Sequence, residues 1–154
     1  MPGNEERTHR AECFVPAAAH AVHEALVRPG QLVQWLPPQG ASGRIDLFEP
    51  WPGGRIRITL VFAANPGKSA ANTDVIEGRF VEIVPDRRVV QAFSFASDDP
   101  RFAGVMTMTW ELQPAPGGTR VQVTATDVPA GIGRQEHEQG MASSLANLRA
   151  WLAR

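Results

Sequence analysis

Six strand-like segments follow one another between residues 44 and 126, and this succession constrains the fold more than any other feature of the chain. The segments are residues 44–49, 55–62, 74–84, 88–95, 105–112 and 119–126. Apolar and polar residues alternate in them, as at Ile56, Ile58 and Leu60, which is typical of strands with one face buried and the other in water. Because short segments rich in glycine and proline separate them, the pattern predicts an antiparallel meander.

A strand and two short helices are predicted before this meander. Residues 8–15 form the strand, and residues 17–27 form a helix with its apolar side chains on one side. We expect Pro29 and Gly30 to end that helix. Residues 31–38 form the second helix, which ends at a pair of prolines because proline removes a backbone amide and clashes with the preceding turn.

The last segment, residues 136–154, predicts a long amphipathic helix, since Met141, Leu145 and Leu148 recur at helical spacing. Gly140 lies inside this helix, where glycine costs roughly 0.5–1 kcal/mol relative to alanine. The missing side chain either leaves room at the mouth of a pocket or lets a strand or loop come close. Alternatively, the helix begins only at Gly140 or Met141, and the sequence leaves these interpretations open.

A strongly curved sheet needs bends, and three glycines are placed to permit them. Gly53 and Gly54 precede one predicted strand, and Gly78 lies inside the next. Glycine at such positions lets a sheet bend or lets another backbone come close. A sheet curved in this way can wrap the last helix, and any space that the two leave unfilled becomes a pocket between them.

The composition fits one domain over residues 1–154, with residues 1–7 as a flexible tail, because 43% of the residues are hydrophobic. The 15 basic and 16 acidic residues nearly balance and the arginines form no run, which excludes nucleic acid and anionic membranes as partners. No segment approaches a signal peptide's apolar core or the ~20 apolar residues of a membrane span. The single cysteine, Cys13, can form no internal disulfide, so we expect a cytoplasmic protein.

Two motifs that would indicate a bound phosphate or a zinc ion are incomplete. Residues 67–69 read Gly-Lys-Ser, but Phe62 stands where a phosphate-binding loop needs its first glycine. Residues 137–141 begin like the helix of a zinc protease, but Met141 stands in place of the second histidine ligand.

The remaining candidate groups are predicted to lie in solvent. His20 and His23 match no metalloprotease arrangement, so we expect a solvated helix face. Asp74, Glu77 and Glu82 could act as acid or base, but carboxylates on strands usually face water. One cysteine also cannot supply a thiolate metal site. We therefore predict no catalytic residue, no metal ion and no cofactor.

Several short motifs occur in order along the chain, among them FEPWPGGRIR and GRFVEIVP. The motif-bearing segments are residues 18–38, 48–57, 78–85, 107–112, 117–121 and 138–148. Their order and spacing resemble the SRPBCC superfamily, with the START and Bet v allergen helix-grip fold, and within it the bacterial branch similar to the activator of heat-shock protein 90 ATPase. The resemblance spans about residues 8–153. It implies an α+β helix-grip fold, in which a curved antiparallel sheet of about seven strands wraps a long C-terminal helix.

The chain departs from this family at two positions. His23 stands where the family often has an aromatic residue, and Met141 stands where it often has a tryptophan. Methionine suits an irregular apolar cavity. Each change therefore either enlarges a pocket or is absorbed by repacking. The resemblance also makes Gly140 the usual glycine of the family's last helix.

By this resemblance, the chain is expected to bind a small apolar or amphipathic molecule in a cavity between the sheet and the last helix. The candidate lining residues are Phe48, Trp51, Ile58, Leu60, Phe80, Phe93, Phe95, Met108, Trp110, Met141, Leu145 and Leu148. The polar groups that such sites need could come from Arg55, Arg57, Glu77 or Arg79 at the rim. The competing interpretation of the apolar residues is plain core packing.

Two other functions fit the same resemblance. A cyclase or hydratase would need a titratable residue inside the cavity. A chaperone-associated module would need a surface patch for its partner, and the family's name supports it only by analogy. Such domains can also form homodimers. The polar loop over residues 64–72 is expected to be mobile and to cover the cavity.

Overall fold

The structure is a computed structural model that describes residues 7–63 and 72–154 of the chain. Its strands are β1 (His9–Val15), β2 (Ala41–Phe48), β3 (Arg55–Phe62), β4 (Thr73–Val84), β5 (Arg88–Phe95), β6 (Met106–Ala115) and β7 (Gly118–Thr126). Its helices are α2 (Ala19–Val27), α3 (Pro29–Trp35) and α4 (Arg134–Leu152), with a 3-10 turn at Pro100–Phe102.

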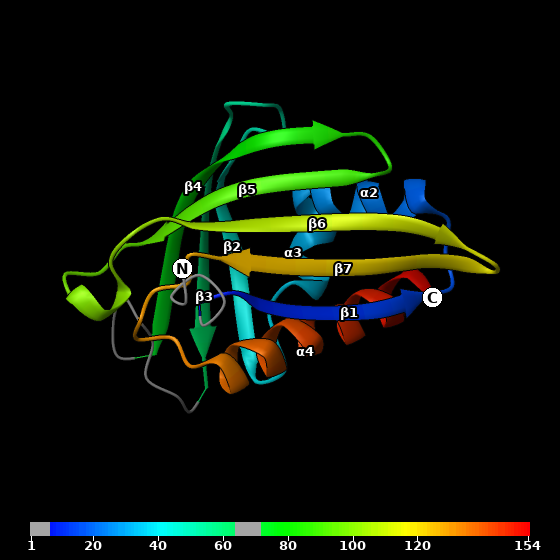
Figure 1. Cartoon of the computed structure of the whole chain (residues 1–154). Coiled ribbons are helices and arrows are strands. Elements are labelled where there is room, and N and C mark those ends of the chain that lie inside the picture. The colour runs from blue at the N-terminus through cyan, green and yellow to red at the C-terminus, as the bar shows by residue number, and fades with distance from the viewer. Residues whose placement is uncertain (1–6, 64–71) are drawn as a thin grey trace.

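The described strands form one antiparallel sheet in the order β1-β7-β6-β5-β4-β3-β2. The sheet curls, so that β2 and β3 run steeply across the direction of β1, β6 and β7 (Figure 1). The long helix α4 runs beside β1, while α2 and α3 lie behind β5 and β6 in the same view. The predicted α+β helix-grip fold, with its order of strand, two helices, six strands and long helix, is confirmed.

Close backbone approaches and extra residues curve the sheet. A side chain at Gly78 would meet the carbonyl oxygen of Ala92 on β5, so only glycine lets β4 and β5 come this close. A side chain at Gly54 would likewise collide with the backbone of the preceding turn. Gly53 lies in that turn and adopts a positive φ of 86°. One extra residue in β2 and one in β4 shift the register of their strand pairs, and such bulges bend a strand and increase its twist.

Two element boundaries differ from those predicted. Pro29 and Gly30 do not merely end the first helix, because they form the first turn of α3. Proline is favoured at the first position of a helix, where its missing N–H group is not needed. The strand β2 begins at Ala41, directly after Gly40, which turns the chain with a φ of 87°.

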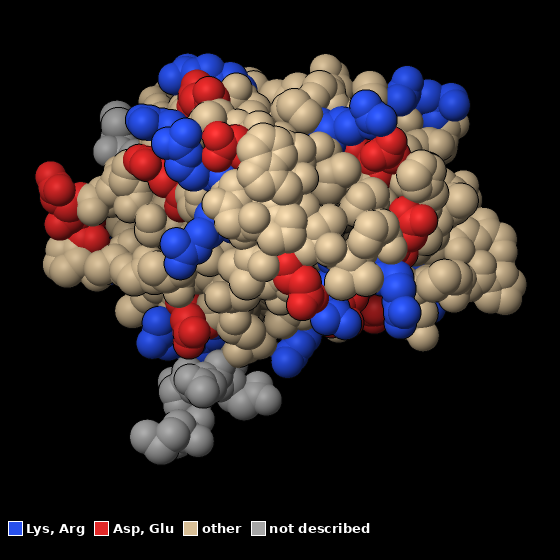
Figure 2. Space-filling model, turned by 90° about the horizontal axis from the view of Figure 1, so that it is seen from above, with Lys and Arg blue, Asp and Glu red and all other residues tan. Residues whose placement is uncertain are grey.

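The surface and the helices agree with a chain of balanced charge. Seen from above, acidic and basic side chains are interspersed, with no broad area of one sign (Figure 2). Within residues 7–63 and 72–154, no helix is long and apolar enough to cross a bilayer. The predicted tail over residues 1–7 and the predicted mobile loop over residues 64–72 lie almost wholly outside the described residues.

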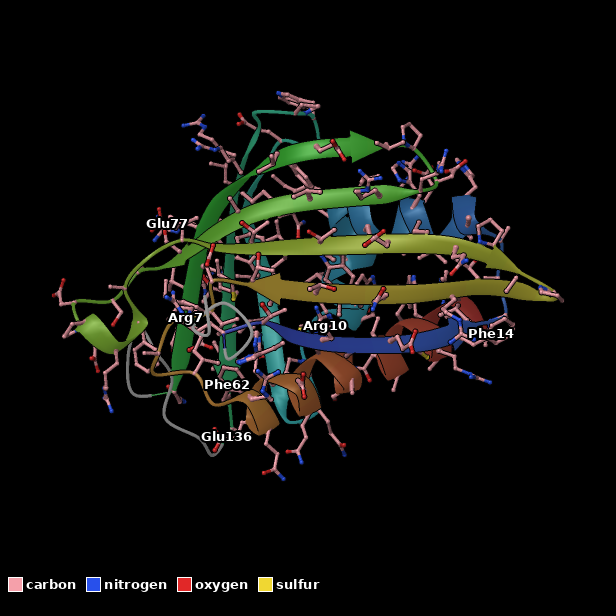
Figure 3. The ribbon with its side chains drawn as sticks, in the orientation of Figure 1. Arg7, Arg10, Phe14, Phe62, Glu77 and Glu136 are labelled. Carbon is pink, nitrogen blue, oxygen red and sulfur yellow. The ribbon has the colours of Figure 1, made fainter. Side chains whose placement is uncertain are left out.

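Strand β1 fixes one flank of α4. The backbone N–H of Arg10 donates to the Glu138 carboxylate (2.9 Å) and the Arg149 guanidinium donates to the Phe14 carbonyl (3.1 Å). Figure 3 shows Arg10 and Phe14 at opposite ends of β1, which runs beside the helix. These contacts tie two turns of α4 to one edge of the sheet.

The segment that follows α3 fixes the other flank of α4. The Gln39 backbone N–H donates to Ser143 Oγ (2.9 Å), and Ser144 Oγ donates to the Leu36 carbonyl (2.6 Å). One turn later, the Asn147 amide donates to the carbonyl of Pro37 (3.0 Å). Because both flanks are bonded, the rotation of α4 about its own axis is set, and with it the side chains that face the sheet.

Candidate functional site

The inner face of the sheet and the side of α4 that packs toward it together carry nearly all of the predicted cavity residues. Eight of them are buried in the core: Ile58, Leu60, Phe80, Phe93, Trp110, Met141, Leu145 and Leu148. Phe48, Phe95 and Met108 are half-buried and pack against the same core. The ring of Phe48 stands edge-to-face on that of Phe80, with centroids 5.3 Å apart. The structure therefore brings these eleven side chains into one apolar cluster.

Trp51 lies apart from this cluster. It is in the turn between β2 and β3, where its backbone N–H donates to the Glu49 carbonyl (2.8 Å), and its side chain is 56% exposed. The alternation of inward and outward side chains does not continue from a strand through a turn. The apolar character of Trp51 therefore did not predict that its side chain is exposed.

We use the word groove for the inner face of the curled sheet, toward α4, on which this cluster lies (Figure 1). The cluster is fully buried along most of this groove and less so at one end. Val89, Val121 and Leu148 are 0% exposed, whereas Phe62, at the end of β3, and Phe95, at the end of β5, are only half-buried. Figure 3 shows Phe62 at the end of the molecule where α4 begins. We call this half-buried region the open end of the groove.

Gly140 lies at this open end, on the flank of α4 that faces the segment after α3. Ser143 and Ser144, at helical spacing from it, are bonded to that segment. Among residues 7–63 and 72–154, nothing outside the neighbouring backbone of α4 lies within 4 Å of the place where a Gly140 side chain would stand. No described strand or loop therefore comes close to Gly140, so within the described residues the explanation by close approach has no support. A helix beginning at Gly140 or Met141 is wrong, because α4 begins at Arg134.

The Gly140→Ala substitution is expected to raise the free energy of unfolding by about 0.5–1 kcal/mol, because alanine loses less backbone entropy in a helix and meets no neighbour here. Urea denaturation of both proteins, followed by circular dichroism, measures the difference. A decrease would show that another group occupies the space beside Gly140.

Polar side chains are buried on the inner face among the apolar ones. Asp74 is 2% exposed and pairs across the strands with Leu60, so the expectation that it faces water is wrong. Gln91 is 4% exposed, and its Oε1 accepts a hydrogen bond from Trp110 Nε1 (3.0 Å). The register places Gln91 in one row with Met108 and Phe80.

Two histidines join β1 to the first turns of α4. His9 is 2% exposed, His137 is half-buried, and their Nδ1 atoms lie 2.8 Å apart. In such a contact one ring nitrogen donates and the other accepts, so the two Nδ1 atoms cannot both carry a proton. Nearby, the Arg134 guanidinium donates to the Thr8 carbonyl (2.6 Å). These residues place acid–base groups toward the end of the groove where α4 begins.

The histidines of α2 differ from the solvated face that the sequence predicted. His20 is exposed and contacts Asp86 Oδ1 (3.0 Å), but His23 is 8% exposed and its Nδ1 has no hydrogen-bond partner among the described residues. The Arg28 guanidinium donates to the Glu24 carboxylate (2.9 Å), and this bond lowers the pKa of Glu24. The described residues hold no group of three or more potential metal-ligating side chains.

The four predicted rim residues lie on the outer face of the sheet instead. Arg55 and Arg57 alternate with the buried Ile56 of β3, and they pair with Arg79 and Glu77 of β4. Figure 3 shows Glu77 on β4, far from the helix α4. Their place follows from alternation, since neighbours of an inward residue on a strand point outward.

The polar residues of the groove were missed although alternation could have found them. Counting back in steps of two from Val15 reaches His9, and counting back from Phe80 reaches Asp74. The position of a residue in its strand, not its polarity, decides which face of the sheet the side chain points to. The contact between His9 and His137 carries no sequence signal, because it depends on how α4 docks on β1.

Comparisons with known proteins agree on the fold. Residues 16–153 match the family model for activator of Hsp90 ATPase homolog 1-like protein. A solved structure of a protein from Chromobacterium violaceum has 25% sequence identity to this chain and a TM-score of 0.86. The match covers 100% of this chain and 99% of that protein. The structure of the AHSA1 protein from Silicibacter pomeroyi has 21% sequence identity and a TM-score of 0.78. That match covers 95% of this chain and 97% of the AHSA1 protein.

One further similar structure is a larger protein. DynU16, a protein in the dynemicin biosynthetic locus, has 20% sequence identity and a TM-score of 0.70. The match covers 96% of this chain but only 47% of DynU16. No curated protein sequence matches the chain significantly.

Proposed function

Since the chain belongs to the family of activator of Hsp90 ATPase homolog 1-like proteins, we propose that it binds a small apolar or amphipathic molecule at the open end of its groove. The observation that carries this proposal is the open space beside Gly140, at the end of α4 where large apolar side chains are only half-buried. Ligand sites are typically concave and mainly apolar, with a few polar groups.

The polar groups near the open end favour an amphipathic ligand. The Asp74 carboxylate can accept hydrogen bonds and the His9–His137 pair can donate or accept them, while Phe62, Phe95 and Met108 offer apolar contact. A ligand that enters beside Gly140 would place its apolar part on these side chains. Its polar end would then meet the histidine pair or the carboxylate.

Binding of a neutral apolar dye tests the site without any knowledge of the natural ligand. We expect N-phenyl-1-naphthylamine to bind with a Kd of about 1–10 μM, with the rise in fluorescence that accompanies transfer from water to an apolar site. Gly140→Trp should weaken this binding about tenfold or more, because the indole fills the space beside α4. Fluorescence titration of both proteins provides the measurement.

Ala146→Trp is the matched control, since it adds the same ring to an exposed position of the same helix. It should leave the dye affinity unchanged. Equal weakening by both substitutions, or absence of saturable dye binding to the parent protein, would overturn the proposal.

Native mass spectrometry of the protein as purified then identifies the natural ligand class and the oligomeric state together. A reproducible mass above that of the bare chain, lost in Gly140→Trp and kept in Ala146→Trp, supports the proposed site. An added mass that survives Gly140→Trp would assign the ligand to another place.

Acid–base groups that are buried, at His9 and Asp74, or half-buried, at His137, favour an enzyme of the hydratase or cyclase kind as the second candidate function. Such an enzyme needs titratable groups inside an apolar site, and His9, His137 and Asp74 meet that requirement. If the molecule found by mass spectrometry is turned over, Asp74→Asn and His137→Gln should lower kcat. Unchanged turnover in both variants would remove this candidate.

A further inference from the structure

A hollow of about 610 Å³ lies on the sheet away from α4, over β3, β4 and β5. Arg55, Arg57, Glu77 and Arg79 form a two-by-two block within it, because Arg55 pairs across the strands with Arg79 and Arg57 pairs with Glu77. Like charges directly opposite one another destabilise a sheet. The block therefore holds an excess of positive charge that the strand pairing itself does not relieve.

Two of these arginines form no ion pair with a carboxylate within residues 7–63 and 72–154, although Arg57 lies close enough to Asp46 to attract it electrostatically. Arg55 is ion-paired with Glu49 (3.2 Å), whereas no ion pair joins Arg57 or Arg79 to a described residue. Asp46 is already bonded to Arg44 (2.7 Å) and to Thr59. The two guanidinium groups stand diagonally across β3 and β4, a spacing that long side chains can bridge.

A second hollow on the protein provides a contrast. It measures about 310 Å³ and also contains arginines, but Arg88 is ion-paired with Glu82 (2.9 Å) and Arg120 with Glu12 (3.5 Å). Most of the charge of these two arginines is thus compensated within the chain. Arg87, the third arginine of the smaller hollow, forms no ion pair with a described residue, so the larger hollow differs in holding two such guanidinium groups instead of one.

The floor and ends of the larger hollow are uncharged. Gly78 and Ala92 form its floor, where their small size leaves space above the sheet. Leu47 and Val105 lie at its margins, with side chains 36% and 59% exposed. Ser94 adds a hydroxyl beside Glu77, donating to the Glu77 carbonyl (3.4 Å). The hollow thus combines a cationic centre with apolar sides, and its volume falls in the range of small-molecule sites, about 300–1,000 Å³.

We propose that this hollow is a second binding site, which takes a small organic oxyanion. Arg57 and Arg79 hold the carboxylate or phosphate group, since guanidinium groups bind both bidentately. Leu47 and Val105 contact the organic part. Glu77 opposes multiply charged anions and so favours ligands with one charged group.

Titration followed by ¹H–¹⁵N NMR tests the site with benzoate, phenyl phosphate and neutral benzyl alcohol at low salt. The Nε–H signals of Arg57 and Arg79 should shift and saturate with benzoate or phenyl phosphate, and should stay in place with benzyl alcohol. Tighter binding of benzoate identifies a carboxylate ligand, and tighter binding of phenyl phosphate identifies a phosphate ligand. Absence of saturation with both anions would overturn the proposal.

Substitutions separate this site from general attraction of anions to a basic surface. Arg57→Gln and Arg79→Gln should each weaken binding about tenfold, as expected for loss of one charge-assisted contact, and Glu77→Gln should strengthen it. Arg120→Gln, on β7 in the smaller hollow, should have no effect. Equal weakening by Arg120→Gln would contradict the assignment. Arg79→Lys keeps the charge but loses bidentate geometry, so it should bind with intermediate affinity.

Discussion

The Trp110→Ala substitution is expected to lower the free energy of unfolding by about 3–5 kcal/mol. Trp110 is 3% exposed, and its ring packs edge-to-face on Trp35 with centroids 5.6 Å apart. Its Nε1 also donates to Gln91 Oε1 (3.0 Å), so truncation leaves a buried amide oxygen without its donor, which itself costs about 1–3 kcal/mol. Because a domain of this kind is stable by only about 5–15 kcal/mol, urea denaturation should show a large shift.

Trp110→Phe separates the two contributions. Phenylalanine keeps most of the aromatic volume against Trp35 but cannot donate to Gln91, so a loss of about 1–3 kcal/mol is expected. A loss below about 1 kcal/mol for Trp110→Ala would show that the site collapses and that Gln91 finds another partner.

The Gly78→Ala substitution is expected to destabilise the protein by about 1–3 kcal/mol or more, as overpacking does. The added carbon would meet the Ala92 carbonyl oxygen and would stand 2.9 Å from Cδ1 of Phe93. Backbone atoms cannot move aside as the end of a flexible side chain can, so β4 must shift away from β5. Urea denaturation measures the change, and hydrogen exchange should show faster opening of the β4–β5 pair.

Gly140→Ala is the matched comparison for this prediction. The same chemical change should stabilise the protein at position 140 and destabilise it at position 78, because only the latter has backbone in the way. Stabilisation at both positions would mean that β4 and β5 tolerate a wider separation than the structure shows.

The arrangement of the strands could be predicted from sequence because it depends on local patterns. Alternation at Ile56, Ile58 and Leu60 identified a strand with one buried face, and the structure buries all three. The spacing of Met141 and Leu145 likewise identified the buried side of α4. Each of these patterns lies within one element, so the path of the rest of the chain does not alter it.

The features of the candidate site were less predictable because they arise between elements. The open space at Gly140 depends on where the segment after α3 stops following α4, and the His9–His137 contact joins residues 128 positions apart. The arginine block of the larger hollow depends on the strand register that sets Arg79 opposite Arg55. A single sequence specifies such relations only through the complete fold.

The pairing of β1 with β7 has a consequence for synthesis on the ribosome. His9 lies opposite Ala125, so the earliest strand to leave the ribosome must wait for the latest one before it gains a partner. β1 ends at Val15 and β7 begins only at Gly118, so at about 5–20 residues per second this wait lasts about 5–20 s. During it, His9 and Val15, which the finished protein buries, stay in water. Early strands in this state are the natural targets of chaperones that bind nascent chains.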